Sequence, residues 1–260
     1  MENKKYFCRA GLLLCVLLAL LLSGCQQVDP RAVYTQAQKK TAALSGSEEQ
    51  IALTLVLDAE GQSGRYTWDM TAKFVQDDKS PKMEIRSENT FPDRSFYSYS
   101  LYSGGRFFAD DNGEKYQAEM AYSVLMNRLY RIYPSIELST SQMKELEVEE
   151  TQEGLSFSFQ LSAGAVKSLA DFAMNQIQNF SGYVPTDVST KTAQGEVLVD
   201  ENLYITRLQL EIPCVVTRRG EEIQGTLSYQ RTLVSPGQTV SIQVQDPESY
   251  QEGSIWDLPW

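Results

Sequence analysis

Residues 141–144, with the sequence Ser-Gln-Met-Lys, have the spacing in which a lysine activates a serine for acyl transfer. Enzymes of that type also carry an S-x-N element and a K-T-G element. Here no S-x-N follows, and residues 191–193 are Lys-Thr-Ala. The chain also has no histidine, which removes the commonest general base and most catalytic zinc sites. We therefore predict no catalytic residue and no enzymatic activity, and we interpret Ser139 and Gln142 as the capping pair of a short turn.

Acidic residues offer two further candidate sites. Residues 110–113 (Asp-Asp-Asn-Gly) and Glu119 fit part of a calcium-binding loop, but the first ligand position is Phe108. A tight hairpin turn explains that segment better. The run from Glu145 to Glu150 alternates acidic and apolar residues, which is typical of a solvated strand face rather than a cation site. Nothing singles out a carboxylate pair of the glycosidase type. We predict no metal and no cofactor.

The N-terminal segment has the organisation of an export signal. Lys4, Lys5 and Arg9 precede an apolar run over residues 11–22, and residues 22–25 are Leu-Ser-Gly-Cys. The run is shorter than the ~20 residues of a membrane-spanning helix, so cleavage is favoured over a retained helix. This pattern resembles a bacterial lipoprotein signal peptide over residues 1–24. The resemblance implies a diacylglyceryl cysteine with palmitate-type chains at Cys25, and a lipid-anchored protein on the extracytoplasmic side of the cell membrane. The alternative is an ordinary secretory signal with an incidental cysteine.

The predicted mature chain is strongly acidic. The full chain has a formal charge of −11, and removing residues 1–24 takes away three basic residues and one acidic residue, leaving −13. Phosphates repel such a surface, so we expect no nucleic-acid partner and little attraction of the bulk of the domain to anionic lipid. Residues 25–29 are the lipidated cysteine and a tether of at most ~13 Å. Cys214 then has no disulfide partner, and its apolar neighbours predict a small buried side chain.

The remaining chain alternates between two hydrophobic periods. Helical spacing occurs after Asp29-Pro30, over residues 119–131 and over residues 166–182, whereas a period of two marks about ten strands, including residues 50–74, 155–161, 197–212, 223–234 and 240–244. Short turns join most of these elements, which indicates an α+β fold with an antiparallel sheet. Three helices cannot cover so many strands laid flat. We expect a strongly curved sheet, a half-barrel with the helices on its concave side, in one domain over residues 30–260.

This pattern is similar to that of lipoproteins with a LolA/LppX-type half-barrel. The similarity covers most of the mature chain and rests on Gly-Gly-Arg-Phe-Phe at 104–108, on the hairpin sequence at 199–210, and on a closing strand before Asp246-Pro247. It carries no diagnostic catalytic residue. The resemblance implies a concave face that holds an acyl chain or another lipid, although many envelope lipoproteins of this shape have no assigned activity.

Aromatic residues are dense between Phe91 and Phe108. Strand propensity and core packing explain such a band, and so does a ligand groove, because a tyrosine offers an apolar ring and a hydroxyl for a headgroup. The predicted groove residues are Trp68, Met70, Phe74, Tyr97, Tyr99 and Tyr102.

The C-terminal sequence contains Trp256 and Trp260. These residues either fold back onto a sheet edge or groove mouth, or contact a membrane or a partner. Two functions stay open. The first is a membrane-anchored lipoprotein that binds a lipid or other apolar ligand in the concavity of the sheet. The second is a non-enzymatic protein-interaction or regulatory lipoprotein whose sheet interior is filled, with an envelope protein as partner.

Overall fold

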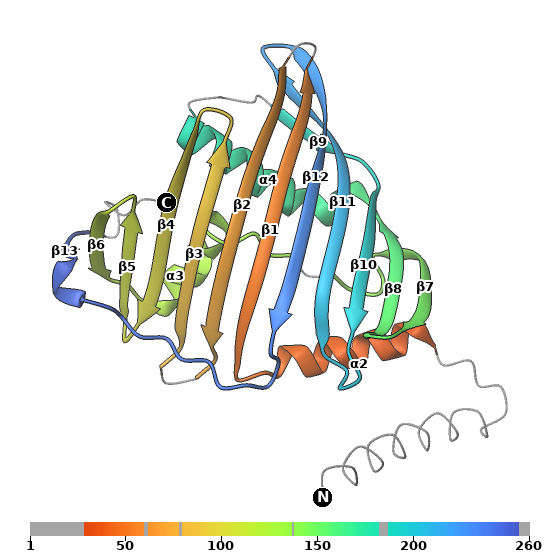
Figure 1. Ribbon diagram of the computed structural model, residues 1–260, viewed down its shortest axis with the longest axis horizontal. Coiled ribbons are helices and arrows are strands. Elements are labelled where there is room, and N and C mark those ends of the chain that lie inside the picture. Colours follow the sequence, from red (N-terminus) through yellow and green to blue (C-terminus); the bar gives the residue numbers. More distant parts are fainter. Residues whose placement is uncertain (1–28, 60–61, 78–79, 137, 182–186, 255–260) are drawn as a thin grey trace, which may run out of the picture.

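The computed structural model describes residues 29–59, 62–77, 80–136, 138–181 and 187–254. Thirteen strands form one curved sheet, and three α-helices lie against its concave side (Figure 1). The predicted fold class is confirmed. The strands are β1 Gly46–Ala59, β2 Gln62–Val75, β3 Lys82–Phe91, β4 Arg94–Ser103, β5 Arg106–Asp111, β6 Glu114–Glu119, β7 Met143–Thr151, β8 Gly154–Leu161, β9 Asp187–Thr190, β10 Ala193–Val199, β11 Ile205–Arg218, β12 Glu221–Val234 and β13 Gln251–Glu252.

The sheet has the order β13-β6-β5-β4-β3-β2-β1-β12-β11-β10-β8-β7, and β9 pairs with β11. All pairs are antiparallel except β13 with β6. Hairpin turns connect β1 through β6 in one half. In the other half, α4 and β9 lie between β8 and its neighbour β10 in the chain, and the pairing of β1 with β12 joins the halves. The turn between β4 and β5 uses Gly104 and Gly105, both at positive φ, where a glycine has no steric penalty.

The helices begin where the sequence places caps and apolar stripes. α2 (Pro30–Ala42) starts after Asp29, whose carboxylate accepts a hydrogen bond from the Arg31 N–H at 3.0 Å. α3 (Tyr122–Arg128) continues as the 3-10 turn η1 (Leu129–Arg131) and is shorter than the predicted 119–131 helix. α4 (Ala163–Ser181) has a buried face over Val166, Leu169 and Ala173. Ser139 and Gln142 form the predicted turn, in which the Ser139 N–H donates to Gln142 Oε1 at 2.8 Å.

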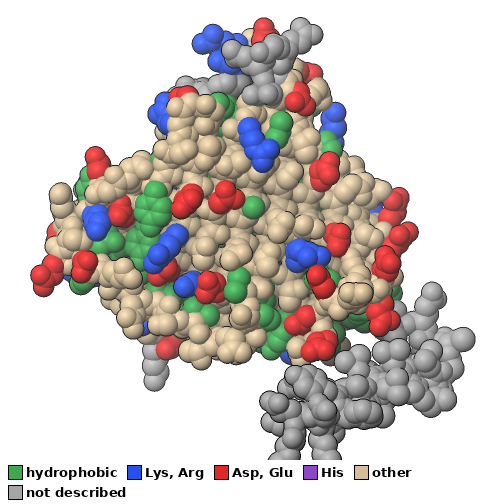
Figure 2. Space-filling view, viewed as in Figure 1, with side chains coloured by type: hydrophobic (Ala, Val, Ile, Leu, Met, Phe, Trp, Pro, Cys, Tyr) green, Lys and Arg blue, Asp and Glu red, His purple; other side chains and the backbone are tan. Residues whose placement is uncertain are grey.

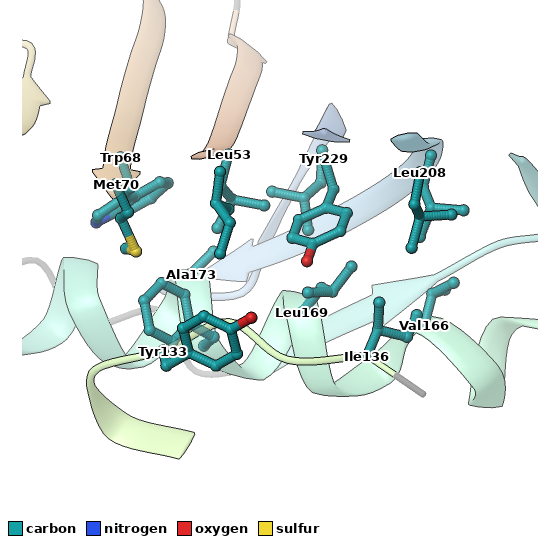
Figure 3. Packing of buried hydrophobic residues seen from close by; sticks show 14 of the residues in the cluster. Leu53, Trp68, Met70, Tyr133, Ile136, Val166, Leu169, Ala173, Leu208 and Tyr229 are labelled. Carbon is teal, nitrogen blue, oxygen red and sulfur yellow. The ribbon is translucent and has the colours of Figure 1, made fainter. Parts of the chain in front are cut away.

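α4 crosses the concave face of the sheet and fills its centre. Figure 3 shows Leu53, Trp68 and Tyr229 projecting from three neighbouring strands toward Leu169 and Ala173 of the helix. The register places Leu53 opposite both Trp68 and Tyr229, so these side chains form one row on the same face. Cys214 is buried, as predicted.

The two halves of the convex face differ in what covers them: a chain segment packs on one half, and polar side chains cover the other. Residues 240–244 are not a strand, which corrects the prediction for that segment. Their alternating apolar side chains pack on the outer face of β4 and β5 instead, where Ile242 joins Tyr99, Leu101, Phe108 and Tyr250 in a second apolar cluster. Figure 2 shows hydrophobic side chains gathered over β4 on this face. The segment then ends in the 3-10 turn η2 (Pro247–Ser249) and in β13.

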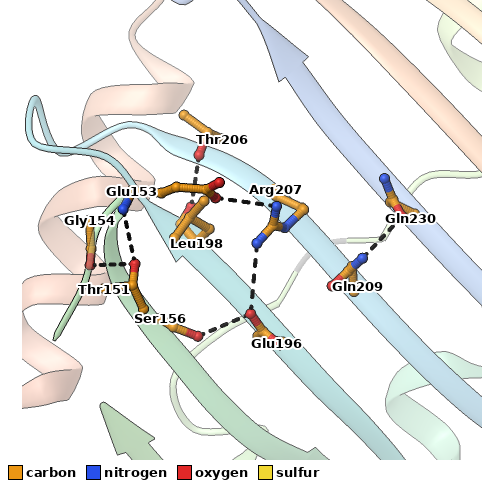
Figure 4. A network of polar contacts seen from close by, with 10 residues as sticks. All are labelled: Thr151, Glu153, Gly154, Ser156, Glu196, Leu198, Thr206, Arg207, Gln209 and Gln230. Carbon is orange, nitrogen blue, oxygen red and sulfur yellow. Dashed lines mark hydrogen bonds and ion pairs between the residues drawn. The ribbon is translucent and has the colours of Figure 1, made fainter. Parts of the chain in front are cut away.

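Polar side chains cover the other half of the convex face. Arg207 of β11 lies 3.4 Å from a carboxylate oxygen of Glu153 and 4.0 Å from one of Glu196, and Ser156 donates to Glu196 at 3.1 Å (Figure 4). Strand β7 at the sheet edge is exposed along most of its length, as the alternating acidic run predicts.

Candidate functional site

The predicted groove residues lie on two opposite faces of the sheet. Trp68, Met70 and Phe74 of β2 point to the concave side. Met83 of β3 is opposite both Phe74 and Tyr102, so Tyr102 of β4 lies on that side too. Tyr97 and Tyr99 have the opposite parity in β4, so they lie on the convex face within the second apolar cluster. The six residues therefore do not form one wall, which corrects the prediction of a single groove.

The centre of the concave face is closed around Trp68. This side chain has no exposed surface, and its ring centroid lies 5.7 Å from that of Phe91 and 6.4 Å from that of Phe172 on α4. Its indole N–H has no hydrogen-bond partner. Met70 is also buried beneath the helix. An alkyl chain has no room there unless α4 moves.

A small polar pocket remains beside this closed centre. Its volume is about 40 Å³, and its lining includes Ser87, Asn89, Ser98 and Ser100 of β3 and β4. Ser87 Oγ donates to Asn89 Oδ1 at 2.6 Å, while Oδ1 of the nearby Asp111 is buried without a partner. Burial, followed by the charges of Glu114 and Asp110, raises the pKa of Asp111. The pocket has the size and polarity for water and not for a lipid chain.

Two larger clefts lie at the end of the half-barrel where Gly46, Val75 and Val234 meet, which is the lower end in Figure 1. We call this end the lower opening. The α2 cleft, of about 610 Å³, lies between α2 and the lower parts of β11 and β12. The α3 cleft, of about 740 Å³, lies between α3 and the lower ends of β1 to β3. The two clefts share Leu44, Ser47, Glu49 and Gln76.

Both clefts have walls of mixed polarity, in which apolar side chains form about half of the lining. The α2 cleft is lined by Tyr34, Leu44, Ile136, Leu138, Val197, Ile205, Leu208 and Leu233, and the α3 cleft by Leu44, Phe74, Val75, Met83, Tyr122, Leu125, Met126 and Leu129. Of the six predicted groove residues, Phe74 lines the α3 cleft, and the other five line neither cleft.

A charged group lies in the floor of the α2 cleft. Arg231 of β12 is opposite Ile51 and Leu208 in the register, so its partly buried guanidinium points to the concave side. Burial alone would lower the pKa of Arg231, but Glu49, Tyr229 and Tyr133 raise it above the ordinary value. The nearby Glu49 carboxylate accepts a hydrogen bond from the Tyr133 hydroxyl. Within the described part of the chain, Arg231 makes no ion pair within 4.0 Å.

The α2 cleft has more cations than anions, in contrast to the whole molecule. Lys39 and Arg231 line it together with one carboxylate, Glu49. A guanidinium has five N–H donors in a planar fork that matches carboxylate and phosphate groups. The cleft thus combines apolar wall segments with a guanidinium that interacts with Tyr133 and Glu49 and also faces the cleft, and an anionic amphiphile could use both features.

Sequence reasoning missed this cleft, although the sequence holds a signal for it. Arg231 occupies the buried phase of a strand, between Tyr229 and Leu233, and Glu49 precedes Ile51 in the buried phase of β1. Charged residues in that phase are costly unless they are paired or functional.

Several predicted sites lie elsewhere. Cys25, Trp256 and Trp260 lie outside the described residues. Residues 110–113 form the β5–β6 hairpin turn, in which Gly113 N–H donates to Asp110 Oδ1 at 2.8 Å. Over the described residues, no group of three acidic or cysteine side chains is arranged for a metal ion, and no helix is long and apolar enough to cross a membrane.

No family model and no curated protein matches the chain. Among solved structures, it is similar to the ywiB protein of Bacillus subtilis, with 8% identity, a TM-score of 0.23 and coverage of 72% of this chain and 92% of the other. It is also similar to a domain of Vibrio parahaemolyticus, provisionally described as an outer membrane lipoprotein-sorting protein, with 8% identity, a TM-score of 0.24 and coverage of 84% and 94%. A DUF1329 family protein of Desulfovibrio piger has 11% identity, a TM-score of 0.23 and coverage of 80% and 95%. TM-scores this low carry no functional information.

Proposed function

We propose that this chain is a membrane-anchored, extracytoplasmic lipoprotein that binds an amphiphilic ligand at the lower opening. The apolar part of the ligand lies in the α2 and α3 clefts, and its anionic group faces Arg231. The observation that carries this proposal is a partly exposed arginine in the floor of a cleft of about 610 Å³, where apolar side chains form about half of the walls and a single carboxylate, Glu49, lies near the cation.

The anchor and the domain boundary belong to the same proposal. The mature chain begins at the diacylglyceryl Cys25, and a single domain covers residues 30–260. Because α2 starts at Pro30 and lies across the lower opening, a tether of ~13 Å holds the clefts close to the bilayer. Mass spectrometry of the membrane-bound protein should give a mature chain that begins at Cys25 with a diacylglyceryl group, and Cys25→Ser should abolish both the modification and the cleavage before it. An unmodified Cys25, or cleavage at another residue, would contradict lipid anchoring at this residue.

The ligand test compares two molecules that differ only in the headgroup. The protein is purified in mild detergent, and binding of palmitate and of methyl palmitate is measured by competition with a fluorescent fatty acid. Arg231→Gln should weaken palmitate binding by about tenfold, which corresponds to ~1.4 kcal/mol, and leave methyl palmitate unchanged. Arg207→Gln is the matched control, because that arginine lies in the polar network on the convex face. Equal losses for both ligands would contradict an anion-binding role of Arg231, and no binding of either would contradict the ligand proposal.

The closed centre supports one alternative, a non-enzymatic protein-interaction or regulatory lipoprotein whose sheet interior is filled by its own helix. α4 occupies the middle of the concave face, where the aromatic band was predicted to hold a ligand. Native mass spectrometry of the protein extracted from its membranes separates the two functions. A lipid that co-purifies supports the ligand proposal, whereas an empty protein that stays empty after incubation with membrane lipids favours the alternative.

A further inference from the structure

Exposed hydrophobic side chains are concentrated on one short stretch of the described structure. Tyr122, Met126 and Tyr130 are 43%, 46% and 55% exposed, and the remaining exposed large hydrophobic side chain is Val148, at 43%, on β7. Tyr122 and Met126 lie one turn apart on α3, and Tyr130 follows on the adjoining 3-10 turn η1. We call them the α3 stripe.

The inner side of the same segment fixes the stripe in place. Leu125 is fully buried, and Val124 and Leu129 pack against the core from partly buried positions. The Tyr122 ring lies 5.7 Å from the buried ring of Tyr102, which holds one end of the stripe against β4. The exposed residues are therefore presented by a packed element and not by a loose loop.

The segment that carries the α3 stripe is basic, in contrast to the acidic chain as a whole. Between Glu119 and Glu137 there is no acidic residue, and the segment contains Arg128 and Arg131. Arg131 Nε donates to the Tyr130 hydroxyl at 3.1 Å, and its guanidinium lies 5.7 Å from the centroid of that ring. Tyrosine and arginine side by side are typical of the headgroup region of a bilayer, where the ring is half in hydrocarbon and the cation faces lipid phosphate.

We infer that the α3 stripe is a membrane-contact surface that docks into the headgroup region of a bilayer containing anionic lipid. Three side chains cannot supply the ~800 Å² per partner of a stable protein interface, which favours lipid over a second copy or another protein. Tyr122 and Met126 also line the α3 cleft, so docking would bring the mouth of that cleft to the lipid surface. The inference rests on the stripe and its charge and requires neither a cleft ligand nor the Cys25 anchor.

The experiment places an environment-sensitive dye at one of two sites of equal exposure. Met126→Cys and Val148→Cys are each labelled with a nitrobenzoxadiazole dye in the mature protein isolated from membranes. The buried Cys214, whose pKa burial raises to about 11, should stay unlabelled. The proteins are reconstituted into phosphatidylcholine vesicles with and without phosphatidylglycerol, with spin-labelled lipid as quencher.

We expect the dye at position 126 to shift to the blue and to be quenched severalfold more than the dye at position 148. The quenching should be stronger with phosphatidylglycerol, and Arg131→Gln should reduce that difference. Equal quenching at both positions would overturn the inference. A blue shift that depends on protein concentration and not on vesicles would overturn it as well, since it would assign the stripe to a second copy of the chain. Circular dichroism confirms that the labelled proteins are folded.

Discussion

The concave face of this sheet has two regions that the same strands build, a closed centre and an open lower end. In the centre, Trp68 and Leu53 lie beneath α4, and no surface of either is exposed. Toward the lower end, Glu49 of β1 and Arg231 of the neighbouring β12 take the positions that apolar residues hold in the centre. The helix that covers the centre does not cover this end, and the α2 and α3 clefts are open there.

The alternation of inward and outward side chains along a strand therefore does not determine whether solvent or a ligand can reach the inward ones. The inward phase of β1, β2 and β12 continues without interruption from the centre to the lower opening. The helix that packs on these inward side chains covers the centre and not the lower opening. Charged side chains appear among the inward residues only where the helix is absent.

Removing the central indole should have the largest effect on stability. Trp68→Ala leaves a cavity beneath Phe172, and we expect a loss of about 3–5 kcal/mol in the free energy of unfolding, measured by urea denaturation. Phe74→Ala, in the same strand but at the lower opening, should cost roughly 1–3 kcal/mol because its ring is only partly buried. Equal losses for the two variants would mean that the centre is no more tightly packed than the lower end.

Removing the hydroxyl group should lower the free energy of unfolding at one buried tyrosine and not at another. Tyr133→Phe removes a hydrogen bond to the Glu49 carboxylate, and we expect a loss of about 1.5–3 kcal/mol. Tyr229→Phe removes a buried hydroxyl that has no partner, so its stability should be unchanged or slightly higher. Denaturation of both variants at neutral pH provides the measurement, and a loss from Tyr229→Phe as large as that from Tyr133→Phe would contradict the assignment.

Alkaline pH should destabilise the folded protein through its buried phenols. Burial, opposed in part by Arg231, raises the pKa of Tyr229 and of Tyr34 from 10.0 to about 12. The unfolded chain ionises these groups near pH 10 while the folded chain keeps them neutral. Their contribution is therefore fully present below pH 10 and is lost as the pH rises from about 10 to about 12. Tyr229→Phe should lose less stability over this range than the wild type; an identical pH profile would show that Tyr229 does not contribute.

The smallest effect on stability should come from the α3 stripe. Tyr122→Ser and Met126→Ser change side chains that are largely exposed, so each should alter the free energy of unfolding by less than about 0.5 kcal/mol. Val148→Ser on β7 is the matched control. A loss of more than about 1 kcal/mol at position 126 would mean that the stripe supports the core and is not a free surface.

Much of the fold can be predicted from the alternation of apolar and polar residues alone. In β1, β2, β8 and β12, the apolar residues that recur at every second position are the buried ones in the structure. The prediction of a single groove was wrong for a physical reason. Tyr99 and Tyr102 belong to one continuous strand at opposite parity, so they cannot line one wall, and the sequence already contains that information. What it does not contain is which segment covers each face. Residues 240–244 have a strand pattern but meet no free strand edge, and they pack on the convex face instead.

The pairing of β1 with β12 also has a consequence for how the chain reaches this state. Residue 48 is opposite residue 234, so the two halves of the sheet are joined by strands that lie far apart in the sequence. Closing so long a loop is slow, and the seam cannot form until almost all of the polypeptide has been released. A nascent chain would therefore lack the pairing of β1 with β12 until residue 234 has been synthesised. Such late closure would suit the export that we propose, in which a chain crosses a membrane before it folds.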